Sequence, residues 1–564
     1  MLWFRAILGG ALAVGGASAF AGNTTGYIDD LFDQSMSFLD QIYDPNAGYL
    51  WWFYYPLAAG KHETRSTVWY AAGLLRRNEG DDVDNAVKII TNVIGDQQKN
   101  VSAQWYGNQL NSPLAKHDGA GRTPLCHFAN WYGSSGSIYN SWDPNWRGFI
   151  GTTLIVIYEE YGHLLPSPVK TLIVESMRNN TIGDSYRVGG VDGDNLYPAY
   201  SNPALMRAVA SGWTGRKLND SNMTAAGEAY AQEVLDLFDR NGTLSEFNSA
   251  TYAGVSLFAL TLWAKYIPDD GSSVMGSNGA RMVADVWTSI GELYNANLRN
   301  VAGPWDRTYG WDMNLYIGIL NAYIWSLVGA DRAPGINTVS KGGRTPAWAT
   351  THADDFEIAP LLAAILPYHH TLIPDAVVEK LAAFPGEHTY AASALSPPWD
   401  NAPRNISSWL AEDITIGAES FDQTVVGGAS INQEQWAPAV AQWLRADGTV
   451  GWFSYWATES AMQVDVKPYR LELTYPRGNE SSVFTFIIGA NPLGQKRNVL
   501  DWADVMGLNV NVSGTVDLSH EVAFCGLNGG SCDPTHGFEF WNFTYVMPAG
   551  STETPNIVLE LGLA

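Results

Sequence analysis

The chain has 564 residues, 46% of them hydrophobic, so it can form a large domain and a smaller one and is neither disordered nor fibrous. Its formal net charge of −25 makes nucleic acid and anionic membranes poor partners, because long-range electrostatics repel both. The 23 Trp and 27 Tyr residues suit a packed core, but they equally suit stacking on the apolar C–H faces of sugar rings.

The first 21 residues, MLWFRAILGGALAVGGASAFA, place one arginine before an apolar run that ends in small residues. This pattern is typical of a secretory signal peptide, with cleavage expected near Ala19 or Ala21. No later stretch of the sequence is long and apolar enough to span a bilayer. We therefore expect a secreted, extracellular protein, with neither nucleic acid nor a membrane as its partner.

Sequons and cysteines agree with secretion. Sequons of the type Asn-X-Ser/Thr are glycosylation acceptors, and their density is typical of an extracellular glycoprotein. They begin at Asn23, Asn100, Asn179, Asn219, Asn222, Asn241, Asn405, Asn479, Asn511 and Asn542. Cys525 and Cys532 bracket the segment GLNGGS and can close a small disulfide loop, whereas Cys126 is left over. No cysteine pattern typical of metal binding is present in the sequence.

From about Asp29 to Lys380, apolar residues recur at spacings of three and four, which predicts helices separated by Gly, Pro and Asn clusters. Many of these helices are apolar nearly all round, as expected for helices packed between neighbours. They cover Tyr27–Ile42, Ser66–Asn78, Asp82–Gly95, Trp146–Tyr161, Ser167–Arg178, Pro203–Gly212, Met223–Arg240, Tyr252–Tyr266, Arg281–Leu298, Asp312–Gly329, Asp355–Leu366 and Pro374–Phe384. Long loops on one side of such a domain are where sites are usually built.

Around Trp399 the pattern changes to alternating polar and apolar residues rich in Val, Ile, Thr and Phe. Segments such as SSWLAEDITIGAES, VGWFSYWA and PNIVLELGL predict an antiparallel β domain, with one more helix at Gln433–Leu444 between strands. The expected fold is therefore α+β and multidomain. It has a signal peptide over residues 1–21, a helical domain over 22–395 and a smaller antiparallel β domain over 396–564.

Three loop-to-helix segments, WDPNWRGFIGTTL, EFNSATYAGVSLFALTLW and DRTYGWDMNLY, carry a resemblance to a known group. With this order of domains they resemble the toroidal polysaccharide lyases, the heparinase II/III-like and hyaluronate, chondroitin and alginate lyase group. The resemblance covers most of the chain in architecture but only short motifs in sequence. It implies an (α/α)6-type helical toroid followed by a β-sheet or sandwich domain. It also implies a polysaccharide or oligosaccharide substrate that contains uronic acid and is cleaved by β-elimination.

A uronate lyase needs a group that neutralises the carboxylate, a base for the adjacent proton and an acid for the leaving oxygen. In LSEFNSATYAGVSL, the resemblance makes Asn248 the candidate neutraliser. Tyr252, one helical turn further on, is a candidate acid or base, and Glu246 is a candidate for substrate binding. The alternative is that Ser245 or Asn248 merely caps the helix that begins near Thr251.

The segment GPWDRTYGWDM forms a second cluster. Arg307 can bind a carboxylate through two parallel hydrogen bonds. Tyr309 can transfer a proton, and Trp305 and Trp311 can stack on sugars. Asp312 either orients Arg307 or caps the following helix. Capping would explain Asp312 alone, and not the other residues of the cluster.

The segment KHETRSTVWY forms a third cluster. His62 is a candidate base, because an imidazole titrates in the working range, and Arg65 would share its face if the segment were helical. The alternative is that Thr64 or Ser66 simply begins a helix. His127, in TPLCHFANWYG, can supply the base in place of His62.

Other candidates are weaker. Trp146 and Arg147, in WDPNWRG, can line a cleft and bind substrate, whereas THADDFEIAP is best explained as a capped helix start and His369–His370 as part of a loop. The predicted chemistry needs no metal or cofactor, although some lyases use a divalent cation. We expect a monomer.

Three other functions fit parts of the sequence. A glycoside hydrolase needs two carboxylates across a cleft, and Glu246, Asp306, Asp312, Asp354 and Glu412 are available. A helical-barrel dehydratase, isomerase or cyclase for a small apolar molecule would use a closed aromatic cavity with one or two acids. A secreted carbohydrate-binding protein would explain the tryptophans but not the polar clusters. We favour the lyase.

Overall fold

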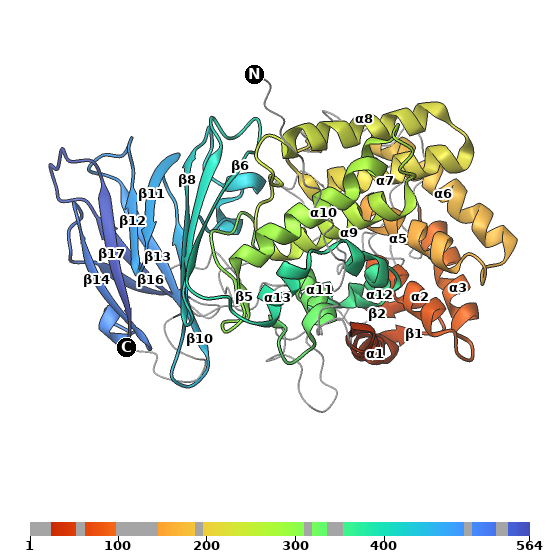
Figure 1. Cartoon of the computed structure of the whole chain (residues 1–564), viewed down its shortest axis with the longest axis horizontal. Coiled ribbons are helices and arrows are strands. Elements are labelled where there is room, and N and C mark those ends of the chain that lie inside the picture. The colour runs from red at the N-terminus through yellow and green to blue at the C-terminus, as the bar shows by residue number, and fades with distance from the viewer. Residues whose placement is uncertain are drawn as a thin grey trace, which may run out of the picture.

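The computed structural model describes residues 24–51, 62–97, 145–185, 196–308, 318–334, 353–489, 499–525 and 540–564. Within these residues the fold is α+β, as predicted: a helical domain is followed by an antiparallel β domain (Figure 1). The predicted signal peptide lies outside the described residues.

The helices lie close to where their apolar periodicity predicts them. For α3 and α5 the predicted and observed bounds are the same, whereas α10 begins earlier and α7 ends later than predicted. The described helices are α1 (Thr24–Ile42), α2 (Arg65–Arg77), α3 (Asp82–Gly95), α5 (Trp146–Tyr161), α6 (Ser167–Ser185), α7 (Ser201–Leu218), α8 (Ser221–Phe238), α9 (Ala250–Tyr266), α10 (Val274–Leu293), α11 (Gly318–Val328), α12 (Ala359–His369) and α13 (Asp375–Ala382).

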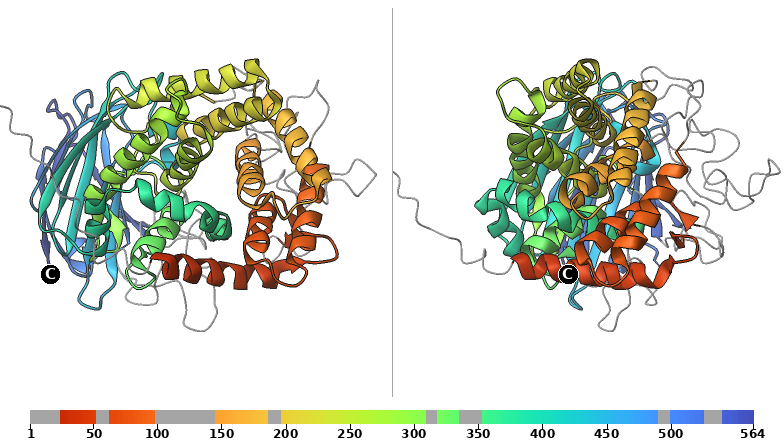
Figure 2. Two further views of the ribbon diagram at one scale, coloured as in Figure 1. Left: turned by 45° about the vertical axis from the view of Figure 1, so that its right-hand side comes forward. Right: turned by 90° about the vertical axis from the view of Figure 1, so that its right-hand side faces the viewer.

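These helices form a closed circuit of contacts. α2 contacts α5, α5 contacts α7, α7 contacts α9, and α9 contacts α11. The short 3-10 helix η6 (Ala353–Ile358) touches both α11 and α2 and closes the circuit. Figure 2 shows the helices curving round a common centre. The predicted count of six helix pairs stays a prediction, because residues 98–144 lie outside the described residues.

Burial separates inner from outer helices. Every residue of α11 is buried, and so are the residues of α9 from Ala250 to Trp263. On α3, by contrast, burial follows one face, which includes Ala86, Ile90 and Val93. A helix that is apolar all round needs neighbours on every side, whereas a one-sided helix covers the outside of the domain. α9 and α11 are therefore inner helices, and α3 is an outer helix.

Twelve strands of the described chain form one antiparallel sheet (Figure 1). β8 pairs with β7, β9 and β11, and the main path runs β14-β17-β12-β11-β8-β9-β10-β13-β16-β15. The strands are β6 (His388–Ala394), β7 (Arg404–Leu410), β8 (Ile414–Asp422), β9 (Ala439–Leu444), β10 (Val450–Trp456), β11 (Ala461–Lys467), β12 (Arg470–Thr474), β13 (Val483–Gly489), β14 (Leu508–Gly514), β15 (Glu521–Cys525), β16 (Phe540–Val546) and β17 (Asn556–Leu563).

Both faces of this sheet are buried along its central strands. Phe453 and Phe486 belong to an apolar core within the β domain. Their neighbours Trp452 and Ile487 belong instead to the core that continues into the helical domain. Successive side chains of a strand point to opposite faces, so one strand serves two cores. The β domain is thereby packed directly against the helices.

One prediction about the β region is wrong, and the first strand of the sheet lies ahead of the predicted domain boundary. Residues Gln433–Leu444 do not form a helix, because they contain a 3-10 turn at Gln433–Gln435 followed by β9. The sheet also begins at His388 in β6, ahead of the predicted boundary at residue 396. Among the described helices, none by itself is long and apolar enough to cross a membrane, although the bent pair Asp355–Leu372 and Asp375–Ala382 meets that criterion jointly.

Candidate active site at the N-terminal ends of the inner helices

Two loops carry the strongest sequence candidates, and they lie side by side. One comprises residues 243–249 before α9, and the other comprises residues 302–308 after the short strand β5 (Asn300–Val301). The Phe247 N–H donates to Asp306 Oδ2 (2.9 Å), and the Asp306 N–H donates to the Phe247 carbonyl (3.2 Å). Ser249 Oγ donates to the Arg307 carbonyl (2.6 Å). These bonds bring Glu246 and Arg307 together.

Glu246 and Arg307 form an ion pair in which the carboxylate is held from two sides. Arg307 Nη1 donates to Glu246 Oε1 (2.9 Å). Glu246 Oε2 accepts the backbone N–H of Asn202 (2.9 Å) and its side-chain Nδ2 (2.8 Å) at the start of α7. A carboxylate with this many donors is fixed in orientation, so it fixes the guanidinium as well.

Two tyrosines surround the guanidinium. Arg307 Cζ lies 3.9 Å from the ring centroid of Tyr252 and 5.1 Å from that of Tyr200. Both distances are within the range of a cation–π contact. Asn145 Nδ2 donates to Tyr200 Oη (2.9 Å), which positions that phenol. The side chain of Arg307 therefore lies between the first turn of α9 and the residue before α7.

A second group of charges lies at the start of α2. Arg65 Cζ lies 5.6 Å from the ring of Trp146, the first residue of α5. Glu357, in η6, is buried near Arg65. Burial raises the pKa of Glu357 to about 8, and the negative charges of Glu63 and Asp355 act in the same direction. At neutral pH Glu357 is therefore largely a neutral acid that can give up a proton.

These two groups join into one circuit, which we call the polar ring: Arg65, Trp146, Tyr200, Glu246, Tyr252, Arg307, Asp355 and Glu357. Thr251 Oγ1 donates to Asp355 Oδ2 and links α9 to η6. Arg307 lies in the loop after β5, and the other ring members lie at or just before the first turns of α2, α5, α7 and α9, or in η6. Helix N-termini carry partial positive charge, which favours anions. An anionic group of a ligand is thus attracted to this end of the domain.

His62 lies three residues before Arg65, in the short strand β3 (His62–Glu63). Its Nε2 is 3.1 Å from Asp44 Oδ2, and its ring stacks on Trp51 with 4.0 Å between centroids. Burial lowers the pKa of His62, although Asp44 opposes this shift. The neutral imidazole donates Nε2–H to Asp44 and keeps Nδ1 as a base. Because the segment is a strand, the predicted shared helical face with Arg65 is wrong.

The helix-capping alternatives are wrong in detail. Asn248 donates both hydrogens of Nδ2, to the carbonyls of Ala302 and Pro304 (2.7 Å each), and its backbone is left-handed (φ 48°). Ser245 Oγ donates to the Leu395 carbonyl. The N-cap position of α9 is occupied by Ser249, so neither predicted residue caps this helix. The amide of Asn248 ties the two loops together rather than facing a carboxylate.

At α2, Glu63 takes the role predicted for Thr64 or Ser66. Its carboxylate accepts the N–H groups of Arg65 (2.9 Å) and Ser66 (2.5 Å). Thr64 is at the N-cap position but forms no capping bond with its side chain. A carboxylate in the strand before the helix therefore satisfies the first N–H groups.

Two predicted substrate-binding residues are fully buried. Trp305 is 0% exposed and its backbone pairs with Ala437 of the β domain (3.0 Å in each direction), so it cannot stack on a sugar. Arg147 is also 0% exposed and lies 3.5 Å from Asp184. The sequence shows that these residues lie near a loop-to-helix junction, but not which way their side chains point.

The histidine pair is not in a loop. His369 ends α12 and is buried, with Trp287 Nε1 donating to its Nε2 (2.8 Å). His370 Nε2 lies 2.9 Å from Ser326 Oγ. His369 lies in the helical core, and His370 is partly buried in the 3-10 turn that follows α12. In the described part of the chain, no group of three or more His, Cys, Asp or Glu side chains could hold a metal ion.

Several predicted residues lie outside the described residues: His127, Tyr309, Trp311, Asp312, Cys532, Asn23 and Asn100. Cys525 ends β15. The sequon asparagines that are exposed are Asn219, Asn222, Asn405, Asn479 and Asn511, and those that are partly buried are Asn179, Asn241 and Asn542. Glycosylation and the disulfide stay predictions.

Four residues of the site were missed by the sequence interpretation: Asp44, Tyr200, Asn202 and Glu357. Each acts on a residue far along the chain, as Asn202 does on Glu246. The sequence offers one sign of their role. Tyr200, Asn202 and Glu357 lie at or next to the start of a helix, as several other candidates do.

No curated protein matches the chain. Heparan sulfate lyase HepC from Pedobacter heparinus aligns at 9% identity over 97% of this chain and 85% of its own, with a TM-score of 0.31. A heparinase III aligns at 10% identity over 95% and 85%, with a TM-score of 0.34. TM-scores this low do not establish a shared fold.

Family models cover both domains. A domain of unknown function, DUF8770, matches residues 386–562, which contain the β domain. A second, DUF8769, matches residues 29–367, which contain the polar ring. Because this match spans more than half of the sequence, the chain belongs to the DUF8769 family.

Proposed function

We propose that this protein is a secreted lyase that cleaves an acidic, uronate-containing polysaccharide by β-elimination at the polar ring. The observation that carries the proposal is the position of Arg307, fixed by Glu246 and enclosed by the rings of Tyr252 and Tyr200. A cation and two phenols in contact supply the charge neutralisation and the proton transfer that this reaction needs.

Arg307 takes over the neutralising role first assigned to Asn248. Its positive charge lies beside the N-terminal turn of α9, so two sources of positive potential coincide. A uronate carboxylate bound there becomes a better electron acceptor, which acidifies the C–H bond next to it. The net charge of −25 on the whole chain makes this local attraction necessary for an anionic substrate.

The reaction moves one proton off carbon and one onto oxygen. A base takes the C5 proton, the C–H electrons form the C4–C5 double bond, and the C4–O bond breaks. The leaving glycosidic oxygen then receives a proton. Nδ1 of His62 suits the base, because Asp44 holds Nε2 and burial keeps the ring neutral. The phenol of Tyr252 suits the acid, because it lies against Arg307.

Glycoside hydrolysis is the second candidate, and Glu357 favours it. A hydrolase needs a carboxylic acid that stays protonated and a second carboxylate that is ionised. Glu357, with its pKa raised to about 8, suits the first role, and Glu246, bound to Arg307, suits the second. The two reactions differ in product, because only elimination leaves an unsaturated uronate.

The test is a panel of glucuronan, alginate, hyaluronan, chondroitin, pectin and gum-type polymers incubated with the purified protein. Ultraviolet absorbance reports the unsaturated product, and a reducing-end assay reports hydrolysis. We expect an absorbance increase on at least one polymer that disappears in Arg307→Met. Arg216→Met is the matched control, because Arg216 pairs with Glu228 (2.7 Å) at the other end of α7.

Reducing ends without absorbance, abolished by Glu357→Gln, would replace the lyase by the hydrolase. Neither signal on any polymer would contradict both and leave the small-molecule dehydratase or isomerase as the remaining enzyme hypothesis.

A further inference from the structure

The pair Glu246–Arg307 is carried by two loops, so something else must hold it in place. Asn248, Phe247 and Ser249 of the first loop bond to the second loop. These bonds fix the loops relative to each other, but not relative to the helices and strands around them. Asn202 at the start of α7 holds the carboxylate of Glu246, and the other elements that anchor the joined loops belong to the β domain.

Several backbone contacts make that connection. The Thr308 N–H donates to the Gln435 carbonyl (2.7 Å), and Ser408 Oγ of β7 donates to the Gly303 carbonyl (2.7 Å). One side chain contacts both loops at once. It is Arg404, the first residue of β7, which is 0% exposed.

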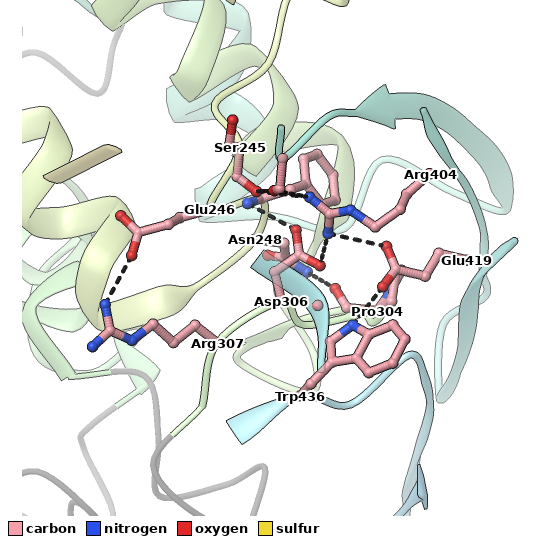
Figure 3. Close-up of polar contacts among 12 residues, drawn as sticks. Ser245, Glu246, Asn248, Pro304, Asp306, Arg307, Arg404, Glu419 and Trp436 are labelled. Atoms are coloured by element: carbon pink, nitrogen blue, oxygen red, sulfur yellow. Dashed lines mark hydrogen bonds and ion pairs between the residues drawn. The ribbon is translucent and has the colours of Figure 1, made fainter. Parts of the chain in front are cut away.

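Arg404 contacts the residue immediately before each member of the pair (Figure 3). Its Nη1 pairs with Asp306, which precedes Arg307. Its Nη2 donates to the carbonyl of Ser245, which precedes Glu246 (2.8 Å). A planar guanidinium with donors pointing in several directions can bridge two such groups in a fixed geometry.

The β-domain side of Arg404 is equally fixed. Nε donates to Asp400 Oδ2 (3.0 Å), and Nη2 also donates to Ser396 Oγ (3.0 Å). Glu419 Oε2 lies 3.6 Å from Nη1, and Trp436 Nε1 donates to Glu419 Oε1 (2.6 Å). With three buried carboxylates around it, Arg404 has one stable position. Arg404 and the β-domain residues that hold it thus determine the positions of both loops.

We infer that Arg404 is a positioning residue: it holds the Glu246–Arg307 pair in its working geometry, and the helical domain depends on the β domain for a complete site. Lysine keeps the charge but has a single ammonium group, which cannot bridge Asp306, Asp400 and the Ser245 carbonyl together. Arg404→Lys therefore tests the geometry rather than the charge.

The first readout does not depend on any substrate. In a crystal structure of Arg404→Lys we expect Glu246 Oε1 and Arg307 Nη1, 2.9 Å apart in the native protein, to move beyond hydrogen-bonding distance. Arg445→Lys is the matched control, because Arg445 is a buried arginine of the β domain that bonds the Gly489 carbonyl (2.6 Å), away from both loops. A folded Arg404→Lys protein that keeps the 2.9 Å contact would overturn the inference.

The second readout rests on the proposed function. Since a displacement of roughly 1 Å at a site costs on the order of 100-fold in rate, we expect kcat/KM of Arg404→Lys to fall by about 100-fold, mainly through kcat. If the substitution only lowers stability, Arg404→Lys will have the native kcat at temperatures below its unfolding temperature. That result would contradict a positioning role for Arg404. If Arg404→Lys fails to fold, Asp306→Asn is the milder variant for both readouts. A displaced pair in a protein that acts on no polymer supports the positioning role and rejects the lyase.

Discussion

Arg307 and Arg404 are both buried arginines beside carboxylates, but their surroundings differ. Arg404 lies among Asp306, Asp400 and Glu419 at the junction of the domains and is 0% exposed. Arg307 is 9% exposed and has, among the described residues, one carboxylate and two tyrosine rings as neighbours. An arginine surrounded by acidic side chains, as Arg404 is, holds neighbouring segments of the chain in place. An arginine beside phenols, at the ends of helices, is suited to an anionic ligand.

The protonation of the two regions differs too. Burial raises the pKa of Glu419 well above its ordinary value, with the charge of Asp306 acting in the same direction. Burial also raises the pKa of Asp306 to about 6, although Arg404 opposes this shift. At the junction, then, burial favours the protonated forms of Glu419 and Asp306, and the charge of Arg404 opposes it. In the polar ring the protonated acid is Glu357, which lies in a helix start rather than in a salt-bridge cluster.

The largest expected effect is on stability, at the junction. Arg404→Met leaves three carboxylates without their cation, and removal of one partner of a buried ion pair typically costs about 3–5 kcal/mol. Urea unfolding followed by tryptophan fluorescence measures the loss. Arg307→Met should lose clearly less, because among the described residues it leaves only the carboxylate of Glu246 without its cation. Equal losses of unfolding free energy in Arg404→Met and Arg307→Met would show that the two arginines do not differ in their contribution to stability.

The next effect is expected on catalytic activity, for a substitution in the polar ring. Tyr252→Phe should lower kcat/KM on the polymer found in the panel by about 100-fold, equivalent to about 2.7 kcal/mol, because general acid catalysis is lost. Tyr368→Phe is the control, since that phenol donates to the Ala264 carbonyl (2.9 Å) in the helical core. Comparable activity of Tyr252→Phe and native protein would exclude Tyr252 as the proton donor.

A third prediction concerns the pH dependence of stability. Glu357 has a folded pKa of about 8, above its unfolded value of 4.5, so its contribution is complete below about pH 4.5 and is lost as pH rises through 8. Glu357→Gln cannot titrate, whereas Glu63, Asp355 and Arg65 around it remain. Between pH 5 and 9 the native protein should lose roughly 4 kcal/mol more than the variant in urea unfolding, because each of the three pH units from 5 to 8 removes about 1.4 kcal/mol. Parallel pH curves would show that Glu357 is ionised throughout.

The smallest effect on stability is expected for an ion pair of arginine and a carboxylate that is exposed to solvent. Arg477 Nη2 lies 2.7 Å from Asp422 Oδ1, but the arginine side chain is 53% exposed. Arg477→Met should change the free energy of unfolding by less than about 0.5 kcal/mol, because solvent screens such pairs. A larger loss would mean that the distance between the charged groups, and not their burial, determines how much these arginines contribute to the free energy of unfolding.

Much of the helical domain follows from its sequence, because helices packed on one or more sides have a 3.6-residue apolar period. The failure at Gln433–Leu444 has a physical reason. All but the last residue of β9 are buried, so this strand shows no polar alternation and its apolar run is compatible with either a helix or a strand. The flanking Pro438 was the available sign against a helix.

The candidate site was predictable in part. Glu246, Tyr252 and Arg307 were selected because acids, phenols and arginines cluster at helix starts, and the structure brings them together. Trp305 is predicted to stack on a sugar and Arg147 to line a cleft, but both are buried, because residue type near a helix start does not determine the direction of a side chain. Glu357 drew no attention in the sequence, because its raised pKa arises from burial against residues nearly 300 positions away.

The central claim is that bonds are broken by elimination at the polar ring. The most direct test compares two quantities in one reaction: the amount of unsaturated uronate, from ultraviolet absorbance, and the amount of new reducing ends. Elimination at the polar ring yields equal amounts of the two, and we expect both to be lost in Arg307→Met. New reducing ends without any unsaturated product would contradict it and assign the cleavage to hydrolysis.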